Sequence, residues 1–271
     1  MPELPEIETA CRGITPHILS HVITQVTVRD GRLRWPVATR LGSILRGHTV
    51  LEVNRRAKYI LVRFEHGWLI LHLGMSGSLR IVPSGTPYKK HDHVDLQFDT
   101  GQCLRLHDPR RFGAVLWTTD NPDQHKLLRD LGPEPLSRSF AGKYLHTLSN
   151  KRTQAIKMFI MDSHTVVGVG NIYANEALFL AGIRPGTPAN TVSLTRYNKL
   201  VTCIKQTLKR SIKLGGTTLR DFVNSDGNPG YFQQTLKVYD RKGEPCRICG
   251  EPIHRIVMNQ RATYYCEHCQ H

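Results

Sequence analysis

The chain has 271 residues, with 37 lysine and arginine side chains against 22 aspartate and glutamate side chains and a net charge of +15. Hydrophobic residues make up 39% of the chain, which is enough for the cores of the two domains usual at this length. No apolar run approaches the ~20 residues that cross a bilayer, so we expect no membrane partner. The positive charge favours a polyanion, and a nucleic acid is favoured over a membrane because no basic amphipathic anchor is evident.

The N-terminal residues predict a short helix rather than a signal peptide. The first six residues are acidic and contain no apolar segment, so we expect a cytoplasmic protein. Pro5 suits the first position of a helix over residues 5–14, and Glu6 and Glu8 suit its positive end.

The next hundred residues predict an antiparallel β-sandwich. Val94, Leu96 and Phe98 alternate with polar residues, as one face of a strand does. No helical pattern separates successive strands, which disfavours a parallel α/β fold. The β-rich segments are near 22–29, 49–64, 68–73, 78–82, 94–98, 103–106 and 114–118.

From about residue 120 the pattern becomes helical, after which residues 131–135 form a candidate linker. One helix is expected to begin near Asn171 and to end before Gly182. Another is expected to begin after Ser193, a good N-cap residue, and to end at Gly215–Gly216. Residues 217–235 are rich in Gly, Asn, Asp and Thr and predict a mobile loop.

Four cysteines near the C-terminus form two C-x2-C pairs. Cys246 and Cys249 make the first pair, and Cys266 and Cys269 make the second, sixteen residues further on. This spacing predicts one structural zinc ion with four thiolate ligands. Two redox C-x-x-C pairs are the alternative, but no thioredoxin-like βαβ pattern surrounds them.

Pro2 and Glu3 are candidates for catalysis if the initiator methionine is removed. An N-terminal amine has a pKa near ~8, so part of it is unprotonated at neutral pH and can attack a sugar carbon to form a Schiff base. Glu3 can move protons beside it. Taken alone, these residues fit an ordinary helix start better, since many chains begin with Met-Pro.

Both ends of the chain together resemble formamidopyrimidine-DNA glycosylase, a bacterial DNA-repair family. The beginning reads Pro-Glu-Leu-Pro-Glu, and the C-terminal cysteine pairs enclose Gln260-Arg261-Ala262-Thr263. Other stretches that resemble the family are residues 56–59, 72–77, 90–93, 108–113 and 168–173. Leu4 favours the purine-directed branch, because endonuclease VIII relatives typically have glycine there.

The resemblance implies a multi-domain α+β fold. We expect an N-terminal antiparallel β-sandwich flanked by helices over residues 1–130, which carries the catalytic end of the chain. A helix–two-turns–helix DNA-binding domain is expected over 131–236, followed by a zinc-finger hairpin over 237–271. The resemblance also places damaged double-stranded DNA in the cleft between the domains and implies a monomer.

The resemblance assigns roles to individual residues. Pro2 would attack C1′ of the damaged nucleotide with Glu3 as acid and base. Lys58 would serve β-elimination, and Arg261 δ-elimination. The nucleotide must leave the stacked duplex for this chemistry, and Met75, Arg110 and Phe112 match the residues that fill the gap. The remaining matches to DNA contacts are His91, Arg152 and Asn171.

Each of these residues also has an ordinary interpretation. Met75 and Phe112 would usually be core residues, Asn171 could be a simple helix cap, and Lys58 and Arg261 could be solvated surface cations. His91 and His93 could form a metal pair on one strand face, which we consider the weaker interpretation.

The sequence thus predicts a bifunctional glycosylase and abasic-site lyase for 8-oxoguanine and formamidopyrimidines. Two alternatives are an endonuclease VIII-like glycosylase for oxidised pyrimidines and a non-enzymatic zinc protein that binds DNA.

Overall fold

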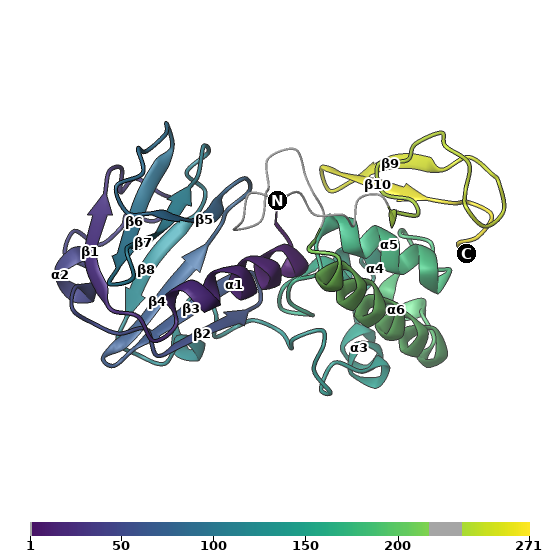
Figure 1. Cartoon of the computed structure of the whole chain (residues 1–271). Coiled ribbons are helices and arrows are strands. Elements are labelled where there is room, and N and C mark those ends of the chain that lie inside the picture. Colours follow the sequence, from purple (N-terminus) through teal and green to yellow (C-terminus); the bar gives the residue numbers. More distant parts are fainter. Residues whose placement is uncertain (1, 217–234) are drawn as a thin grey trace. The chain divides into compact units, whose positions relative to one another are not determined.

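A computed structural model describes residues 2–216 and 235–271, and the chain divides into two compact units (Figure 1). The first unit holds the described residues up to Asp130 and residues 214–216. The second holds Leu131–Lys213 and the described residues from 235 onward. The expected loop over 217–235 lies outside the described residues except for Thr235.

Helix α1 (Leu4–Ile18) opens the first unit and is longer than the expected 5–14. Its N-cap is Glu3, and Pro5 stands in its first turn, where a missing N–H costs nothing. The helix continues beyond residue 14 because Ile14 and Ile18 both point into the core and are buried. This outweighs the cost of Pro16 within the last turn.

The first unit contains two four-stranded antiparallel sheets, as predicted (Figure 1). The strands of one sheet, in spatial order, are β1 (Ile23–Val28), β6 (Asp92–Phe98), β7 (Gln102–His107) and β5 (Ser78–Pro83). Those of the other are β2 (Glu52–Arg56), β3 (Tyr59–Phe64), β4 (Gly67–His72) and β8 (Ala114–Thr118).

The core of this unit lies between the two sheets and under α1. Leu71 and Val115 of one sheet line the same interior space as Leu96 and Leu104 of the other. Helix α1 contributes Ile7 to the same hydrophobic cluster. The α1 helix is thereby fixed to the sandwich, which matters because the N-terminal residues precede it directly.

Two features of the first unit differ from expectation. The β-rich stretch 49–64 is two strands joined by a two-residue turn, Ala57–Lys58, because a chain reversal there lets β2 pair with β3. A short helix, α2 (Leu41–Leu45), was not predicted, since five residues are too few for a helical period to be recognised.

The second unit is mainly helical. Its helices are α3 (Gly142–Ser149), α4 (Ile156–Met161), α5 (Asn171–Ala181) and α6 (Leu194–Lys213). A short 3-10 segment, η1 (Pro122–Gln124), precedes the second unit, and another, η2 (Ala189–Thr191), lies within it. Helix α6 packs against α3 and α5. The helical region therefore begins at residue 142 rather than near 120, apart from one 3-10 turn.

The two helix boundaries predicted from capping residues are confirmed. Helix α5 begins at Asn171 and ends at Ala181, directly before its C-cap Gly182, whose φ of 72° is left-handed. Helix α6 begins after Ser193, whose hydroxyl accepts a hydrogen bond from the Arg196 N–H at 3.4 Å. Strands β9 (His254–Met258) and β10 (Arg261–Tyr265) form a hairpin at the end of the chain. The predicted fold class, a β-sandwich with helices followed by a helical unit with a cysteine-rich hairpin, is confirmed.

Candidate active site and nucleic-acid interface

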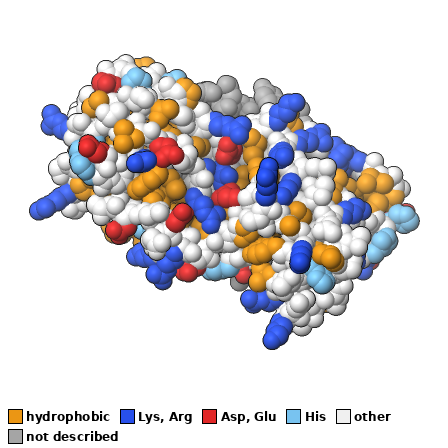
Figure 2. Space-filling view, turned by 90° about the horizontal axis from the view of Figure 1, so that it is seen from below, with side chains coloured by type: hydrophobic (Ala, Val, Ile, Leu, Met, Phe, Trp, Pro, Cys, Tyr) orange, Lys and Arg blue, Asp and Glu red, His pale blue; other side chains and the backbone are white. Residues whose placement is uncertain are grey.

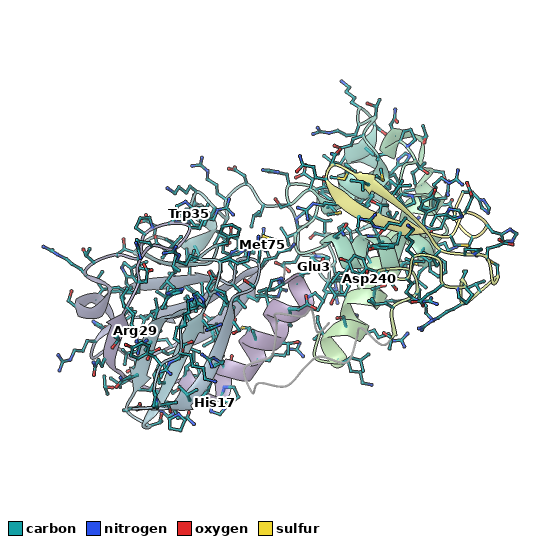
Figure 3. The ribbon with its side chains drawn as sticks, turned by 90° about the horizontal axis from the view of Figure 1, so that it is seen from above. Glu3, His17, Arg29, Trp35, Met75 and Asp240 are labelled. Atoms are coloured by element: carbon teal, nitrogen blue, oxygen red, sulfur yellow. The ribbon has the colours of Figure 1, made fainter. Side chains whose placement is uncertain are left out.

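The beginning of the chain is fixed by the first turn of α1. Pro2 and Glu3 are buried, and the side chains of Glu3 and Glu6 form a reciprocal capping box. In it, the Glu3 N–H donates to Glu6 Oε2 at 2.8 Å. Figure 3 shows Glu3 at this end of the helix. A carboxylate beside the residue predicted to be the nucleophile is therefore held at a defined place.

Lys58 lies in the turn between β2 and β3, close to His72 at the end of β4. Burial, together with the positive charges of Lys58 and Arg34, lowers the pKa of His72 to about 4. The Gly74 N–H donates to His72 Nδ1 at 3.1 Å. His72 is therefore neutral at pH 7 and carries its proton on Nε2, where it can donate a hydrogen bond.

Met75 and Phe112 are exposed, so the interpretation of both as core residues is wrong. Met75 is 38% exposed and Phe112 is 44% exposed, and both line one hollow of about 490 Å³ together with His72. Met75 comes three residues after the end of β4, and Figure 3 shows its side chain. Large exposed apolar side chains that meet at a hollow mark a binding surface.

Arg110 belongs to the same surface. Its guanidinium lies over the Phe112 ring, 5.0 Å from the centroid. The loop that carries both residues is held by the buried carboxylate of Asp108, which accepts hydrogen bonds from the N–H of Gly113 at 2.7 Å and of Arg110 at 3.3 Å. The structure thus brings Met75, Arg110 and Phe112 together, as the resemblance implies.

Gly74 allows the two loops of this surface to meet. Its φ is 62°, and a Cβ atom at this position would lie 2.5 Å from the Phe112 carbonyl carbon. Only glycine fits such a left-handed, crowded position. The motif around residues 72–77 therefore has a steric explanation in addition to its resemblance to the family.

His91 and His93 do not share a strand face, because His91 lies in the turn before β6 with a φ of 74°. Their rings are 6.2 Å apart. The His93 ring is buried and bonds to the Asp108 carbonyl through Nε2 at 2.9 Å. His91 remains partly exposed, and desolvation and the charge of Lys90 lower its pKa. Among the described residues, no cluster of three metal ligands includes either histidine.

Asn171 is the first residue of α5, and the N-cap is Gly170. The interpretation of Asn171 as a simple helix cap is therefore wrong. Its Nδ2 atom donates to the Ala262 carbonyl at 3.0 Å, which ties the helix to strand β10. Its position at a helix N-terminus remains suitable for an anion.

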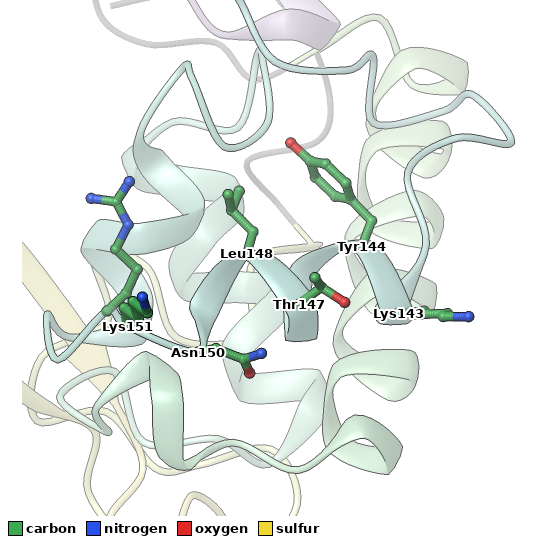
Figure 4. A pocket seen from close by; sticks show the side chains of 7 residues that line it. Lys143, Tyr144, Thr147, Leu148, Asn150 and Lys151 are labelled. Carbon is green, nitrogen blue, oxygen red and sulfur yellow. The ribbon is translucent and has the colours of Figure 1, made fainter.

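Arg152 is exposed in the loop after α3. Its backbone is fixed on both sides, since its N–H donates to the Ser149 carbonyl at 2.8 Å and its carbonyl accepts from Asn190 at 3.0 Å. A hollow lies beside it, and Figure 4 shows side chains that line this hollow. That hollow is lined by Lys143, Tyr144, Thr147, Leu148, Asn150, Lys151 and Arg152, with no acidic residue among them.

The four predicted zinc ligands converge. Their Sγ atoms all lie within 4.8 Å of one another, with Cys249 and Cys266 at 3.4 Å and Cys246 and Cys269 at 3.9 Å. Tetrahedral zinc with thiolates at about 2.3 Å places sulfurs about 3.8 Å apart. The geometry fits one structural zinc ion, with no coordination position left for a substrate.

Arg261 is exposed at the start of β10, directly after the turn residues Asn259 and Gln260, which have φ of 44° and 60°. The sequence did not reveal what holds this strand. Lys157 of α4 is buried, and its Nζ donates to the Ala262 carbonyl at 3.1 Å and to Thr263 Oγ1 at 2.7 Å.

Two further residues of α5 hold the same region, and sequence reasoning missed them as well. Asn175 Oδ1 accepts from the Tyr264 N–H at 2.8 Å. The buried Glu176 carboxylate accepts from three successive N–H groups, those of Lys237, Val238 and Tyr239. Burial raises the pKa of Glu176 despite these hydrogen bonds. Only the buried polar positions of an otherwise apolar helix could have indicated this role.

Three family models match the chain in order. They are the formamidopyrimidine-DNA glycosylase N-terminal domain over residues 1–115, the H2TH domain of the same enzyme over 131–223, and a zinc finger found in FPG and IleRS over 243–271. The formamidopyrimidine-DNA glycosylase of Methylococcus capsulatus is 60% identical over 270 residues and covers 100% of both chains. The chain belongs to the formamidopyrimidine-DNA glycosylase family.

Other relatives agree with this membership. The formamidopyrimidine-DNA glycosylase of Photorhabdus laumondii is 56% identical over 271 residues, with 100% of both chains covered. The MutM (Fpg) protein of Thermus thermophilus is 36% identical with a TM-score of 0.88, covering 99% of this chain and 98% of that one. Lactococcus lactis Fpg in complex with DNA that contains an abasic site is 32% identical with a TM-score of 0.90, covering 99% of each chain.

As a member of the formamidopyrimidine-DNA glycosylase family, the chain is a DNA glycosylase of base excision repair with one structural zinc. The interpretation as a non-enzymatic zinc protein is therefore wrong. Within the parts of the chain that the structure describes, no helix is both long and apolar enough to cross a membrane.

Proposed function

We propose that this family member removes oxidised purines from duplex DNA with Pro2 as nucleophile and then cuts the abasic strand. The observation that carries the proposal is the capped, buried start of α1, which fixes Pro2 and Glu3 beside each other in a chain that matches the family over its whole length. Removal of the initiator methionine would make Pro2 the free secondary amine that this chemistry requires.

The first half of the reaction replaces the base with the enzyme. The amine lone pair of Pro2 forms a bond to C1′ while the glycosidic C1′–N bond breaks, and the departing base takes a proton. Glu3 accepts the proton released by the amine and protonates O4′ as the sugar ring opens to an iminium. The enzyme and the sugar are then joined covalently.

The second half breaks the DNA strand. Loss of a proton from C2′ expels the 3′ phosphate, and loss of a proton from C4′ expels the 5′ phosphate. Lys58 would hold the phosphate in the first elimination, and Arg261 in the second, because a fixed cation stabilises the charge that develops on a leaving phosphate. Hydrolysis of the iminium then frees Pro2.

We also propose the DNA contacts that the sequence predicts. Met75 and Phe112 would enter the stack where the damaged nucleotide has left, with Arg110 bonding to the orphaned base. His91, Arg152 and Asn171 would bind phosphates. Figure 2 shows lysine and arginine side chains over both units, as a partner with a charged backbone requires.

The proposed domain limits are 1–130, 131–236 and 237–271, with the zinc hairpin as a small domain that presents Arg261. Such a protein would work in the cytoplasm, where the bacterial chromosome lies. The zinc supplies the folding energy of the hairpin when bound.

Oxidised purines are the preferred substrate in this proposal, because Leu4 occupies the position that differs in the pyrimidine-directed branch. Oxidised pyrimidines are a second candidate, since Lactococcus lactis Fpg, 32% identical to this chain, has been solved with DNA containing an oxidised pyrimidine as well as with Fapy-dG DNA.

Borohydride trapping on a panel of lesion duplexes tests the proposal. We expect a covalent adduct with 8-oxoguanine or formamidopyrimidine opposite cytosine, and much less with thymine glycol. Pro2→Gly should reduce the trapped fraction at least roughly tenfold, because the secondary amine is lost. Full trapping by protein that retains its initiator methionine would contradict the assignment of Pro2.

A further inference from the structure

Glu8 of α1 is paired with Arg55 of β2, and Arg55 also binds the turn that carries Lys58. Arg55 Nε donates to Glu8 Oε2 at 2.8 Å, and Arg55 Nη1 donates to the Ala57 carbonyl at 2.9 Å. The Arg55 side chain is 10% exposed and that of Glu8 is 20% exposed. One guanidinium thus joins helix α1 to the β2–β3 turn through hydrogen bonds strengthened by charge.

The turn needs such support. Ala57 has a φ of 55°, in the left-handed region that favours glycine. An L-residue stays in this conformation only where its surroundings hold it there. The bond from Arg55 to the Ala57 carbonyl fixes the peptide that leads into Lys58, and it therefore sets the direction in which the Lys58 side chain begins.

The connection has one end near the Pro2–Glu3 end of α1 and the other end next to Lys58. These are the groups that must act in sequence. Glu8 lies five residues after Glu3, about 7–8 Å along the helix, and α1 is a continuous helix between them. Lys58 follows Ala57 directly. Elimination requires the phosphate contact of Lys58 and the covalent bond from Pro2 to C1′ at the same time. The distance between the β2–β3 turn and the start of α1 therefore matters.

We propose that Glu8 and Arg55 are positioning residues that hold Lys58 in register with the Pro2–Glu3 end of α1 during β-elimination. The inference rests on the proposed roles of Pro2 and Lys58. Neither Glu8 nor Arg55 touches the reacting atoms; both act through the backbone of the turn.

The chain offers a matched control for the Arg55 bond. Arg12 donates to the other oxygen of the same carboxylate, Glu8 Oε1, at 2.7 Å. The Arg12 side chain is 67% exposed, and the hydrogen bonds that it makes include none to the turn. Its ion pair is of the solvent-exposed kind that contributes little. Removing Arg12 changes the charge around Glu8 but leaves the connection to Ala57 intact.

The test is single-turnover cleavage of a duplex with a preformed abasic site, with borohydride trapping in parallel. Arg55→Gln should slow β-elimination roughly tenfold through loss of orientation, while the trapped adduct accumulates because the Pro2 amine is unchanged. Arg12→Gln should cleave at the normal rate. Glu8→Gln, which keeps an acceptor oxygen, should fall between the two.

Further variants separate this inference from the proposed function. Lys58→Met should slow β-elimination, and adding Arg55→Gln to it should cause little further loss, because the two changes act on one step. If Lys58→Met cleaves slowly while Arg55→Gln cleaves at the normal rate, the positioning role alone is overturned. A normal Lys58→Met would overturn the role of Lys58 and the inference with it. If Arg55→Gln does not fold, Glu8→Gln decides, and equal rates for Glu8→Gln and Arg12→Gln would refute the proposal.

Discussion

Individual side chains at the start of the chain serve the fold and the proposed reaction at once. Glu3 is the N-cap of α1 and also the proposed acid and base, and Glu6 completes the capping box. His72 lies near Lys58 as a neutral ring whose tautomer is set by the Gly74 N–H. A substitution at these positions must therefore be examined for its effect on folding as well as on chemistry.

Glu3→Gln should abolish base excision but retain the helix. The amide oxygen can still accept the N–H bonds of the cap, whereas the acid/base function is lost, so excision of 8-oxoguanine should fall at least roughly 100-fold. Incision at a preformed abasic site should fall much less, because the sugar there already opens to an aldehyde and Glu3 need not protonate O4′. Glu65→Gln, at an exposed turn, is the control. Normal excision by Glu3→Gln would exclude the proposed role.

His72 should make the first unit less stable in mild acid. Its pKa is about 4 in the folded chain against an ordinary 6.5, so the unfolded chain binds a proton more readily, and stability falls as the pH drops from 6.5 toward 4. The loss should be about 2 kcal/mol, reduced by the partial exposure of the ring. Urea unfolding at pH 7.5 and 4.5 measures it, and His72→Gln should show a smaller difference between the two pH values.

At the scale of elements, the binding surface is held in place mainly by contacts between elements. These are close backbone contacts between loops and buried polar contacts between helices and a strand. The Gly74 turn meets the Phe112 loop, and strand β10 is held from the side of α4 and α5. Neither contact follows from the periodicity of one element.

Gly74→Ala should separate the effect of crowding from that of backbone conformation. Gly85 has a similar left-handed φ of 85° but nothing within 4 Å of an added Cβ, whereas Gly74 would meet Phe112 at 2.5 Å. Gly85→Ala should cost about 1 kcal/mol in free energy of unfolding. Gly74→Ala should cost more and also weaken DNA binding. Equal costs and unchanged binding would show that the loops can move apart freely.

Zinc removal should weaken DNA binding, because the hairpin that presents Arg261 depends on the metal. Cys249→Ser, or treatment with a chelator, should raise the Kd for an abasic-site duplex by roughly tenfold or more. Fluorescence anisotropy with parallel metal analysis measures this. Cys203→Ser changes a buried cysteine of α6 that is not among the converging ligands and should retain the zinc. Unchanged binding by verified metal-free protein would refute the prediction.

The sequence predicted those features that have a local signal. Alternation identified the strands, Gly182 and Ser193 marked helix boundaries, and the cysteine spacing identified the zinc site. The β2–β3 turn was missed because Ala57 carries no mark of a left-handed residue. Lys157 was missed because its partner Thr263 lies 106 residues away in the sequence, and the exposure of Met75 became visible only with the surface.

At the scale of the whole molecule, the net charge follows from the sequence alone, whereas the positions of the charges depend on the fold. The net charge of +15 lies largely on the surface, since most lysine and arginine side chains in the described part of the chain are exposed or partly exposed. Counterion release from DNA then becomes a large part of the binding free energy.

DNA affinity should therefore fall steeply with salt. If Lys58, His91, Arg152, Asn171 and Arg261 lie at phosphates, the three permanent cations alone imply a slope of log Kobs against log[salt] of about −2.7 or steeper. Arg261→Ala should reduce the slope by about 1. Titrations at several salt concentrations measure both values, and a flat response would exclude an interface dominated by the DNA backbone.

The burial of Lys157 makes the stability of the second unit depend on zinc binding. Its ammonium group is kept in the interior by oxygens on β10, and a hairpin that has lost its ion no longer has to keep those oxygens in place. A charge left in an apolar interior is costly, so metal depletion would loosen α4 as well as the hairpin. Calorimetry would then record two melting steps. The Tm of the second unit would change with the concentration of free zinc, whereas the Tm of the β-sandwich would not.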